Sequence, residues 1–476
     1  MILELLLQIC LFVGALLFTA AVLFVSWHRW KYQGDGNDRT LAFFHPFCAA
    51  GGGGERVLWA ILQALGEIDQ QGLPMKIVIY TIDPPSESYK SDVLEKVNDR
   101  FSLAISPTLD ISFIHLDDCA AFLERASRLS MVVESWGTMR LAYAALVRTK
   151  VAPKIFVDTT GCAFTYMVAR VLFGCRVLAY VHYPTISTDM LSMVWERRRV
   201  TYNNQAYIAN SRITTFIKLV YYSMFAVAYG TVGSLCDLVL VNSTWTFNHI
   251  NSLWWLVALQ RKIKVVFPPC RISSDTTRTG PRERIVLSIG QFRPEKDHEL
   301  QIQALSQLFQ KHPTLKGSIT MVLVGGCRGP SDEARLRHLQ TKAKDLDLES
   351  SVVFSVNQPY SVVEDWLGKA SVGIHTMWNE HFGIGVVEMM SAGLITIAHD
   401  SGGPKSDIVV PLDGQPTGML ASTAEGYADA MHQAFTMNNA DADRMRKNAR
   451  LSAERFSDEK FNLSFKKEIL ESGILQ

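Results

Sequence analysis

Four consecutive glycines, Gly51-Gly52-Gly53-Gly54, separate an apolar segment from a helical pattern that runs from Glu55 to Leu65. Glycines at a strand-to-helix turn let a substrate approach the backbone closely, and the N-terminus of the following helix favours an anion. The run is neither G-x-G-x-x-G nor a P-loop, and a flexible turn is the alternative interpretation. Because each glycine costs backbone entropy, four of them together favour a binding role.

Two cations, Arg293 and Lys296, lie three residues apart in the segment 290–298, just past another apolar run. An arginine can fork to two oxygens and a lysine acts as a point charge, so the pair suits a diphosphate. On charge alone, a solvated loop is an equally good interpretation.

Two acids, Glu380 and Glu388, enclose Gly383 and Gly385 in the segment 380–388. The glycines predict accessible backbone N–H groups at a helix start, with Glu388 about two turns into that helix. Carboxylates beside such a turn suggest sugar hydroxyls as partners. The alternative is one capping acid and one surface acid.

These residues follow short apolar runs that alternate with helix-length segments, the pattern of parallel strands covered on both faces. We expect one α/β domain over residues 40–268, a linker over 268–281, a second α/β domain over 282–450 and a helical tail over 451–476. The expected strands are Leu41–Phe44, Lys76–Tyr80, Ile111–His115, Lys154–Asp158, Val177–Val181, Asp237–Val241, Lys262–Phe267, Arg284–Ile289, Ser318–Val324, Val352–Val356, Ser371–His375 and Leu394–Ala398. Two such domains place a ligand cleft between them.

The N-terminal segment predicts a membrane anchor over residues 1–31. Leu5 to Trp27 holds 23 residues without a charge, which at ~1.5 Å per residue spans a ~30 Å hydrocarbon core. Basic residues follow this segment, so the positive-inside rule places the body in the cytosol. A cleaved signal peptide is the weaker alternative because a basic n-region is missing. We therefore expect no glycan at the sequons of Asn242 and Asn462.

Composition narrows the class of protein. With 47 Lys+Arg, 46 Asp+Glu and 48% hydrophobic residues, the chain is neither disordered nor a typical nucleic-acid binder. Its eight scattered cysteines indicate free thiols rather than disulfides or zinc. Two further apolar stretches, 219–236 and 254–259, are interpreted as core helices or as a face in the membrane interface; a second span is disfavoured.

Taken together, Glu380-x7-Glu388, Arg293, Lys296 and the glycine turn resemble a retaining glycosyltransferase of family 4, whose fold is GT-B, from about residue 40 to the end. Within that family, the motifs His45–Trp59, His182–Ser187 and Gly402–Asp407, with the anchor, are similar to eukaryotic mannosyltransferases of the endoplasmic reticulum. The resemblance implies that GDP-mannose donates the fourth and fifth mannoses, in α-1,2 linkage, to dolichol-diphosphate-linked Man3GlcNAc2 on the cytosolic face. It also implies the other mannosyltransferases of the pathway as partners.

The resemblance further implies a role for each matched residue. Arg293 and Lys296 hold the donor diphosphate and stabilise the leaving group, Glu380 faces the transferred sugar, and Glu388 binds the ribose. The remaining implied contacts are His182 near the reacting centre, Gly52 and Gly53 near the diphosphate, and the backbone of Phe382, Gly383 and Ile384 near sugar and phosphate.

The implied mechanism is same-face attack, driven by charge stabilisation on the departing diphosphate. We expect no metal cofactor, because the Asp-x-Asp pairs Asp345/Asp347 and Asp441/Asp443 lie in charged, helix-like segments. Two other functions are kept as alternatives: a GT-B enzyme with another nucleotide sugar and glycolipid, and a non-catalytic membrane-tethered scaffold.

Overall fold

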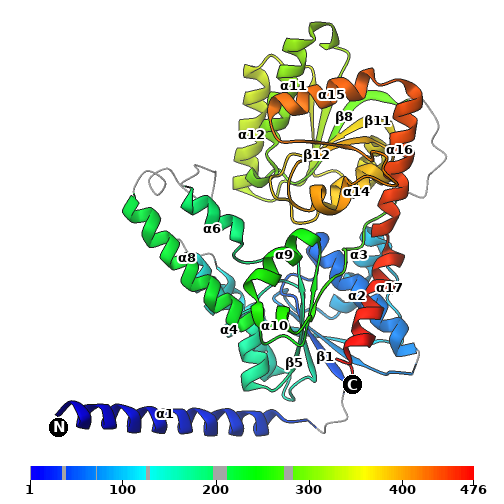
Figure 1. Ribbon diagram of the computed structural model, residues 1–476. Helices are drawn as coiled ribbons and strands as arrows, with labels where there is room; N and C mark the ends of the chain where they lie inside the picture. The colour runs from blue at the N-terminus through cyan, green and yellow to red at the C-terminus, as the bar shows by residue number, and fades with distance from the viewer. Residues whose placement is uncertain (1, 35–38, 71, 125–128, 197–211, 273–281) are drawn as a thin grey trace.

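The computed structural model describes residues 2–34, 39–70, 72–124, 129–196, 212–272 and 282–476. One long N-terminal helix, α1 (Ile2–Tyr32), projects from two α/β domains stacked one above the other (Figure 1). The segment 273–281, which holds most of the expected linker, lies outside the described residues.

The first domain contains a seven-stranded sheet with every neighbouring pair parallel, in the order β3-β2-β1-β4-β5-β6-β7. Its strands are β1 (Thr40–Phe44), β2 (Lys76–Thr81), β3 (Asp110–His115), β4 (Ile155–Asp158), β5 (Arg176–Val181), β6 (Leu238–Val241) and β7 (Ile263–Val265). Helices connect them: α2 (Gly53–Gln70), α3 (Tyr89–Phe101), the 3-10 helix η1 (Asp117–Leu123), α4 (Ser130–Arg148), α5 (Thr165–Met167), the π-helix η2 (Val168–Leu172), α6 (Thr188–Trp195), α8 (Arg212–Gly233), α9 (Thr244–Leu253) and α10 (Trp255–Leu259).

The second domain contains a six-stranded parallel sheet in the order β10-β9-β8-β11-β12-β13. Its strands are β8 (Glu283–Ile289), β9 (Thr320–Gly325), β10 (Val352–Val356), β11 (Ala370–Ile374), β12 (Ile395–His399) and β13 (Met419–Ala421). Its helices are η3 (Pro294–Lys296), α11 (His298–Lys311), η4 (Pro313–Leu315), α12 (Pro330–Asp345), α13 (Tyr360–Lys369), α14 (Ile384–Ser391), η5 (Pro404–Ile408), α15 (Ala424–Thr436), α16 (Asn439–Ala453), η6 (Glu454–Phe456) and α17 (Asp458–Ser472).

The near-continuous apolar runs form strands because both faces of each sheet are covered. In β1 every residue is buried, and its side chains alternate between two apolar clusters: Ala42 and Phe44 in one, Leu41 and Phe43 in the other. Each expected strand overlaps an observed one. Strand β7 is shorter than expected because Phe267 leaves the sheet and packs against Phe382 and Phe456. The three-residue strand β13 gave no signal in the sequence.

The C-terminal residues return to the first domain (Figure 1, red). Phe461, Phe465 and Ile469 of α17 belong to the same apolar cluster as the buried face of α2. At the start of α17, Asp458 accepts two hydrogen bonds of 2.7 Å from Arg56 of α2. The domains are therefore joined by the segment after β7 and again by α16–α17.

Helix α1 touches the first domain only near its C-terminal end. Arg29 donates to the carbonyls of Val171 and Arg170, and His28 lies 3.1 Å from the carbonyl of Leu172. By length and composition, Phe12–Tyr32 and Arg212–Gly233 are the two described helical segments that could cross a membrane.

Helix α8, which contains most of the apolar stretch 219–236, has one face in the core and one at the surface. Tyr222, Phe225 and Tyr229 are buried against the domain, whereas an outer row of apolar side chains is exposed. That row consists of Ile213, Phe216, Ile217, Val220, Met224 and Val227. In the other apolar stretch, Trp254 is 0% exposed but its neighbour Trp255 is 56% exposed. Each stretch thus contributes both to the core and to the surface.

Candidate active site

The glycine turn opens α2 and is braced from the ends of two central strands. The Glu55 carboxylate accepts a hydrogen bond from the Gly52 amide, and its other oxygen lies 3.4 Å from His45 Nε2. On the far side of the imidazole, His45 Nδ1 lies 2.7 Å from the Thr159 hydroxyl. Burial alone would raise the pKa of Glu55, but His45 and the Gly52 amide lower it. Glu55 therefore stays ionised and fixes the turn.

His182 follows β5 and lies behind the same turn. A Cβ added to Gly54 would lie 3.7 Å from His182 Nε2, and this buried nitrogen has no hydrogen-bond partner. Burial lowers the pKa of His182 to about 4. The neutral imidazole thus keeps one polar atom for a ligand at the glycine turn.

Arg293 and Lys296 follow β8, where η3 begins with Pro294 at its first position. Lys296 forms an ion pair with Glu380 and lies 3.3 Å from the Met377 sulfur. In contrast, Arg293 forms no ion pair with any residue that the structure describes. The two cations therefore differ: Lys296 is held in place, and Arg293 is available to an incoming anion.

Glu380 lies in the loop between β11 and α14, where two cationic or polar groups surround it. Besides Lys296, His375 Nε2 lies 3.1 Å from the Glu380 carboxylate. Burial would raise the pKa of Glu380, but Lys296 and His375 hold it well below its usual range. The Glu380 backbone is fixed too, because its carbonyl accepts a 2.7 Å hydrogen bond from the Gly403 amide. This explains the Gly402-Gly403 pair, since a Cβ on Gly402 would lie 2.3 Å from that carbonyl.

The start of α14 meets the glycine turn across the two domains. Gly383 precedes this helix with a φ of +119°, which favours glycine, and leaves the first helix amides without partners inside the helix. A Cβ on Gly53 would lie 2.8 Å from the Ile384 Cδ1 atom. Phe382 is buried against Phe267 and Phe456, so its side chain anchors the loop and only its backbone is positioned for a ligand.

Glu388 is separate from the Lys296–Glu380 pair, although only eight residues separate the two acids. It lies five residues into α14, in the second turn and closer to the helix start than expected. Its carboxylate lies 3.5 Å from the Tyr360 hydroxyl. Burial raises the pKa of Glu388 to about 7, against the opposing effects of Arg56, Tyr360 and Arg271. The two acids thus face different surroundings, one strongly ionised and one close to its titration point.

The structure adds His381, Asn379 and Asp189 to the cleft, and no sequence pattern had assigned a role to any of them. His381 stacks on Tyr183 of the first domain with a centroid distance of 5.0 Å, and burial lowers the pKa of His381 to about 4. Hydrogen bonds also cross between the domains, from Asn379 to Asp189 and from both the amide and the hydroxyl of Thr244 to Asp407. No local sequence pattern marks a histidine such as His381, because its partners lie far away in the chain.

Three of the four carboxylates in the Asp-x-Asp pairs form ion pairs with nearby cations. Asp347 pairs with Lys316 at 2.6 Å, Asp441 with Arg444 at 2.6 Å, and Asp443 with Arg446 at 3.3 Å. Over the described ranges, no group of three or more His, Cys, Asp or Glu side chains is placed to hold a metal ion.

Family models match almost the whole body of the chain. Residues 38–254 match the model described as "ALG11 mannosyltransferase N-terminus", and residues 273–452 match "Glycosyl transferases group 1". The boundary between the two matches falls near the passage from the first domain to the second.

Relatives and solved structures agree with this division. The chain is 42% identical over 443 residues to the GDP-Man:Man(3)GlcNAc(2)-PP-Dol alpha-1,2-mannosyltransferase of Mus musculus, covering 90% of this chain and 87% of that one. With the Homo sapiens protein of the same name it shares 41% identity over 90% of this chain and 86% of that one. Sucrose-phosphate synthase from Thermosynechococcus elongatus superposes with a TM-score of 0.63 at 19% identity, over 91% of this chain and 98% of that one. Such likenesses show a GT-B fold of two Rossmann-like domains.

Proposed function

The chain belongs to the family of GDP-Man:Man(3)GlcNAc(2)-PP-Dol alpha-1,2-mannosyltransferases, and from this premise we propose how and where it acts. It transfers mannose from GDP-mannose to a dolichol-diphosphate-linked Man3GlcNAc2 acceptor with retention of the anomeric configuration. It adds the fourth and the fifth mannose in turn. The reaction takes place on the cytosolic face of the endoplasmic reticulum.

One observation carries the proposal: the group Lys296–Glu380–His375 lies beside the start of α14, which meets the glycine turn of the other domain. A sugar diphosphate held at this junction would contact cations, helix amides and a carboxylate at once. Arg293 and Lys296 would stabilise the charge that builds on the phosphate as the glycosidic bond breaks. Preplaced charges of this kind act more strongly on the transition state than on the ground state.

The protonation states favour a retaining, leaving-group-driven mechanism. Glu380 is held as a carboxylate beside Lys296, so it is suited to bind the mannose hydroxyls or to stabilise positive charge on the sugar rather than to supply a proton. His182 and His381 are neutral at physiological pH, since burial lowers both pKa values to about 4. The acceptor hydroxyl then passes its proton to the departing phosphate oxygen, on the same face of the sugar.

The separate surroundings of Glu388 support its assignment to the nucleoside. With the Tyr360 hydroxyl 3.5 Å away and α14 holding it one turn beyond Ile384, its carboxylate is placed to accept hydrogen bonds from ribose hydroxyls. The diphosphate would then lie between Glu388 and Glu380, over the helix amides.

The direct test is transfer from radiolabelled GDP-mannose to a synthetic phytanyl-diphosphate Man3GlcNAc2 acceptor. We expect two additions, both removed by an α-1,2-specific mannosidase, and loss of transfer in Glu388→Ala. A panel of UDP- and ADP-sugars serves as control. Transfer from another donor in preference to GDP-mannose, or full activity of Glu388→Ala, would contradict the proposal.

We also propose that α1 is a single-pass anchor and that the exposed row of α8 lies in the same membrane surface. Both helices extend toward the same side of the view in Figure 1. Trp195 and Trp255, on the neighbouring helices α6 and α10, are also exposed, and tryptophan is enriched at membrane interfaces. The Asn242 side chain is buried and its amide oxygen accepts a hydrogen bond from Thr246, so the folded chain shields this sequon.

A further inference from the structure

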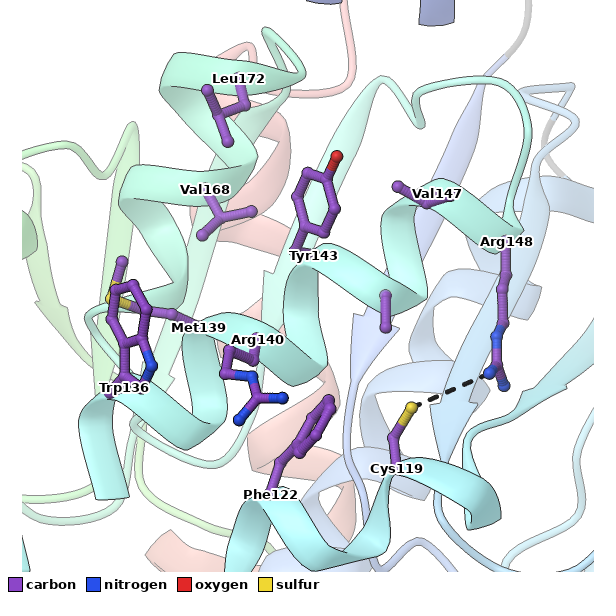
Figure 2. Close-up of a pocket in the computed structure, with 11 residues that line it drawn as sticks. Cys119, Phe122, Trp136, Met139, Arg140, Tyr143, Val147, Arg148, Val168 and Leu172 are labelled. Atoms are coloured by element: carbon purple, nitrogen blue, oxygen red, sulfur yellow. Dashed lines mark hydrogen bonds between the residues drawn. The ribbon is translucent and has the colours of Figure 1, made fainter. Parts of the chain in front are cut away.

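An apolar groove runs along the outer face of α4, away from the candidate active site. Figure 2 shows α4 crossing between η2, which carries Val168 and Leu172, and η1, which carries Cys119 and Phe122. The groove has a volume of about 540 Å3, within the range of roughly 300–1,000 Å3 that small-molecule sites occupy. From α4 itself come Trp136, Met139, Tyr143 and Val147.

The walls of this groove are unusually exposed for apolar side chains. Trp136 is 60% exposed and Tyr143 is 41% exposed. An exposed tryptophan beside an apolar depression is typical of a binding surface rather than of a monomer's ordinary exterior.

The groove is continuous with the end of the membrane helix. Leu172, which lines it, offers its carbonyl to His28 of α1, and Tyr143 lies 5.8 Å from the His28 ring. Trp27 and Trp30 of α1, which flank His28 in the sequence, are both exposed. If α1 crosses the bilayer as proposed, the groove opens where hydrocarbon meets the headgroups on the side of the catalytic body.

A cation without a carboxylate partner lies at the edge of the groove. The Arg140 guanidinium is exposed and stacks 3.8 Å over the Phe122 ring, and no acid within the described ranges pairs with it. Its neighbour Arg148 differs, because Asp118 neutralises it at 2.5 Å. An apolar groove with one arginine at its edge that no carboxylate neutralises complements a ligand with a hydrocarbon chain and an anionic head.

We propose that this groove binds the isoprenoid chain of the polyprenyl-diphosphate acceptor, with Arg140 close to its diphosphate. The inference rests on the proposed function for the identity of the acceptor. The chain would leave the bilayer beside α1 and lie along α4. The oligosaccharide would extend from there toward the cleft between the domains.

Binding is tested first without any transfer reaction. The probe is a polyprenyl diphosphate that carries a benzophenone on its chain and no sugar, added to the full-length protein in detergent. We expect photolabelling within residues 130–148 or 168–172, abolished by unlabelled geranylgeranyl diphosphate and unaffected by dioleoyl phosphatidic acid. Labelling elsewhere, or equal competition by the phosphatidic acid, would overturn the assignment to an isoprenoid.

Kinetics provide the second test. Trp136→Ala and Arg140→Gln should each raise KM for the phytanyl-linked acceptor about fivefold to tenfold, with kcat and KM for GDP-mannose unchanged. With an acceptor on a hexyl chain, Trp136→Ala should show no effect, whereas Arg140→Gln should still raise KM because the diphosphate is present in both acceptors. The control Arg337→Gln on exposed α12 should change neither. Equal changes for both acceptors in Trp136→Ala would indicate a structural defect and contradict the proposal. If the groove is labelled but GDP-mannose supports no transfer, the proposed function fails and the groove assignment survives.

Discussion

Lys296 and Glu380 form an ion pair although 84 residues separate them in the chain. Lys296 follows β8 and Glu380 follows β11, and these two strands are neighbours in the second sheet. The carboxyl ends of parallel strands meet at one edge, so both side chains reach the same point above it. The lysine proposed to bind the phosphate is thus held against the carboxylate proposed to face the sugar.

Removing the lysine should therefore affect two steps. Lys296→Ala takes away a charge from the leaving diphosphate and leaves Glu380 buried without its cation. We expect kcat for mannose transfer to fall about 100-fold to 1,000-fold, the range for loss of one transition-state-stabilising group. Radiolabelled transfer assays measure this. Lys316→Ala, which breaks an exposed pair with Asp347, is the matched control and should leave kcat unchanged; a similar fall in both variants would refute the assignment.

A methyl group at Gly53 should disturb the contact between the domains. It would lie 2.8 Å from Ile384 Cδ1, the far end of a flexible side chain. The energetic cost of this clash is therefore modest. We expect Gly53→Ala to lower kcat/KM about threefold to tenfold. Ile384→Val removes the clashing atom and should restore activity in the double variant. Gly329→Ala, where the added Cβ meets nothing within 4 Å, serves as control. Failure of Ile384→Val to rescue the double variant would show that the clash is not the cause.

Glu388 should give the protein a pH-dependent stability. Burial raises its pKa to about 7, from the ordinary 4.5, so the folded chain holds this proton more tightly than the unfolded chain. Its stabilising contribution is complete below about pH 4.5 and is lost as the pH rises through 7. Between pH 5 and pH 8, the free energy of unfolding of Glu388→Gln should rise by about 1–2 kcal/mol relative to that of the parent. Thermal unfolding at both pH values measures the gain.

The control for that experiment is Glu349→Gln, which changes an exposed acid at the surface of the second domain. It should shift Tm equally at pH 5 and pH 8. A pH-independent difference between the parent and Glu388→Gln would contradict the raised pKa of Glu388.

Transfer should not depend on a divalent metal. Three of the four Asp-x-Asp carboxylates, Asp347, Asp441 and Asp443, form ion pairs with lysine or arginine, and the candidate site offers cations of its own for the diphosphate. We expect the initial rate of mannose transfer to be unchanged by an excess of EDTA. Loss of activity that Mn2+ or Mg2+ restores would refute this prediction.

Two adjacent tryptophans should report on the membrane interface. Trp255 is 56% exposed on α10, which contacts α8, whereas Trp254 is fully buried against Gly233. In vesicles that contain bromine-labelled lipids, we expect the fluorescence attributable to Trp255 to be quenched and that of Trp254 to be unaffected. Comparison of Trp255→Phe with Trp254→Phe isolates each contribution. Equal quenching in the parent and in Trp255→Phe would place this face away from the lipid.

Local patterns were sufficient for the elements that carry the site. Buried parallel strands appear in the sequence as apolar runs. The glycines that follow these runs mark places where backbone amides stay accessible, as at Gly383. The helix start was foreseen for the same reason, but Glu388 lies closer to it than expected. A sequence pattern defines where a helix begins only to within a few residues.

The sequence by itself determined the class of fold, the apolar N-terminal helix and the charged and glycine-rich turns, because each depends on neighbours within one strand or one helical turn. Only the tertiary structure decided that Lys296 meets Glu380, that Gly53 abuts Ile384, that α17 returns to α2 and that α8 exposes one of its two apolar faces. An almost wholly apolar helix has no polar stripe to mark its outer side, so packing alone decides which face is exposed. Contacts between distant strands likewise follow from their order in the sheet, which no local pattern encodes.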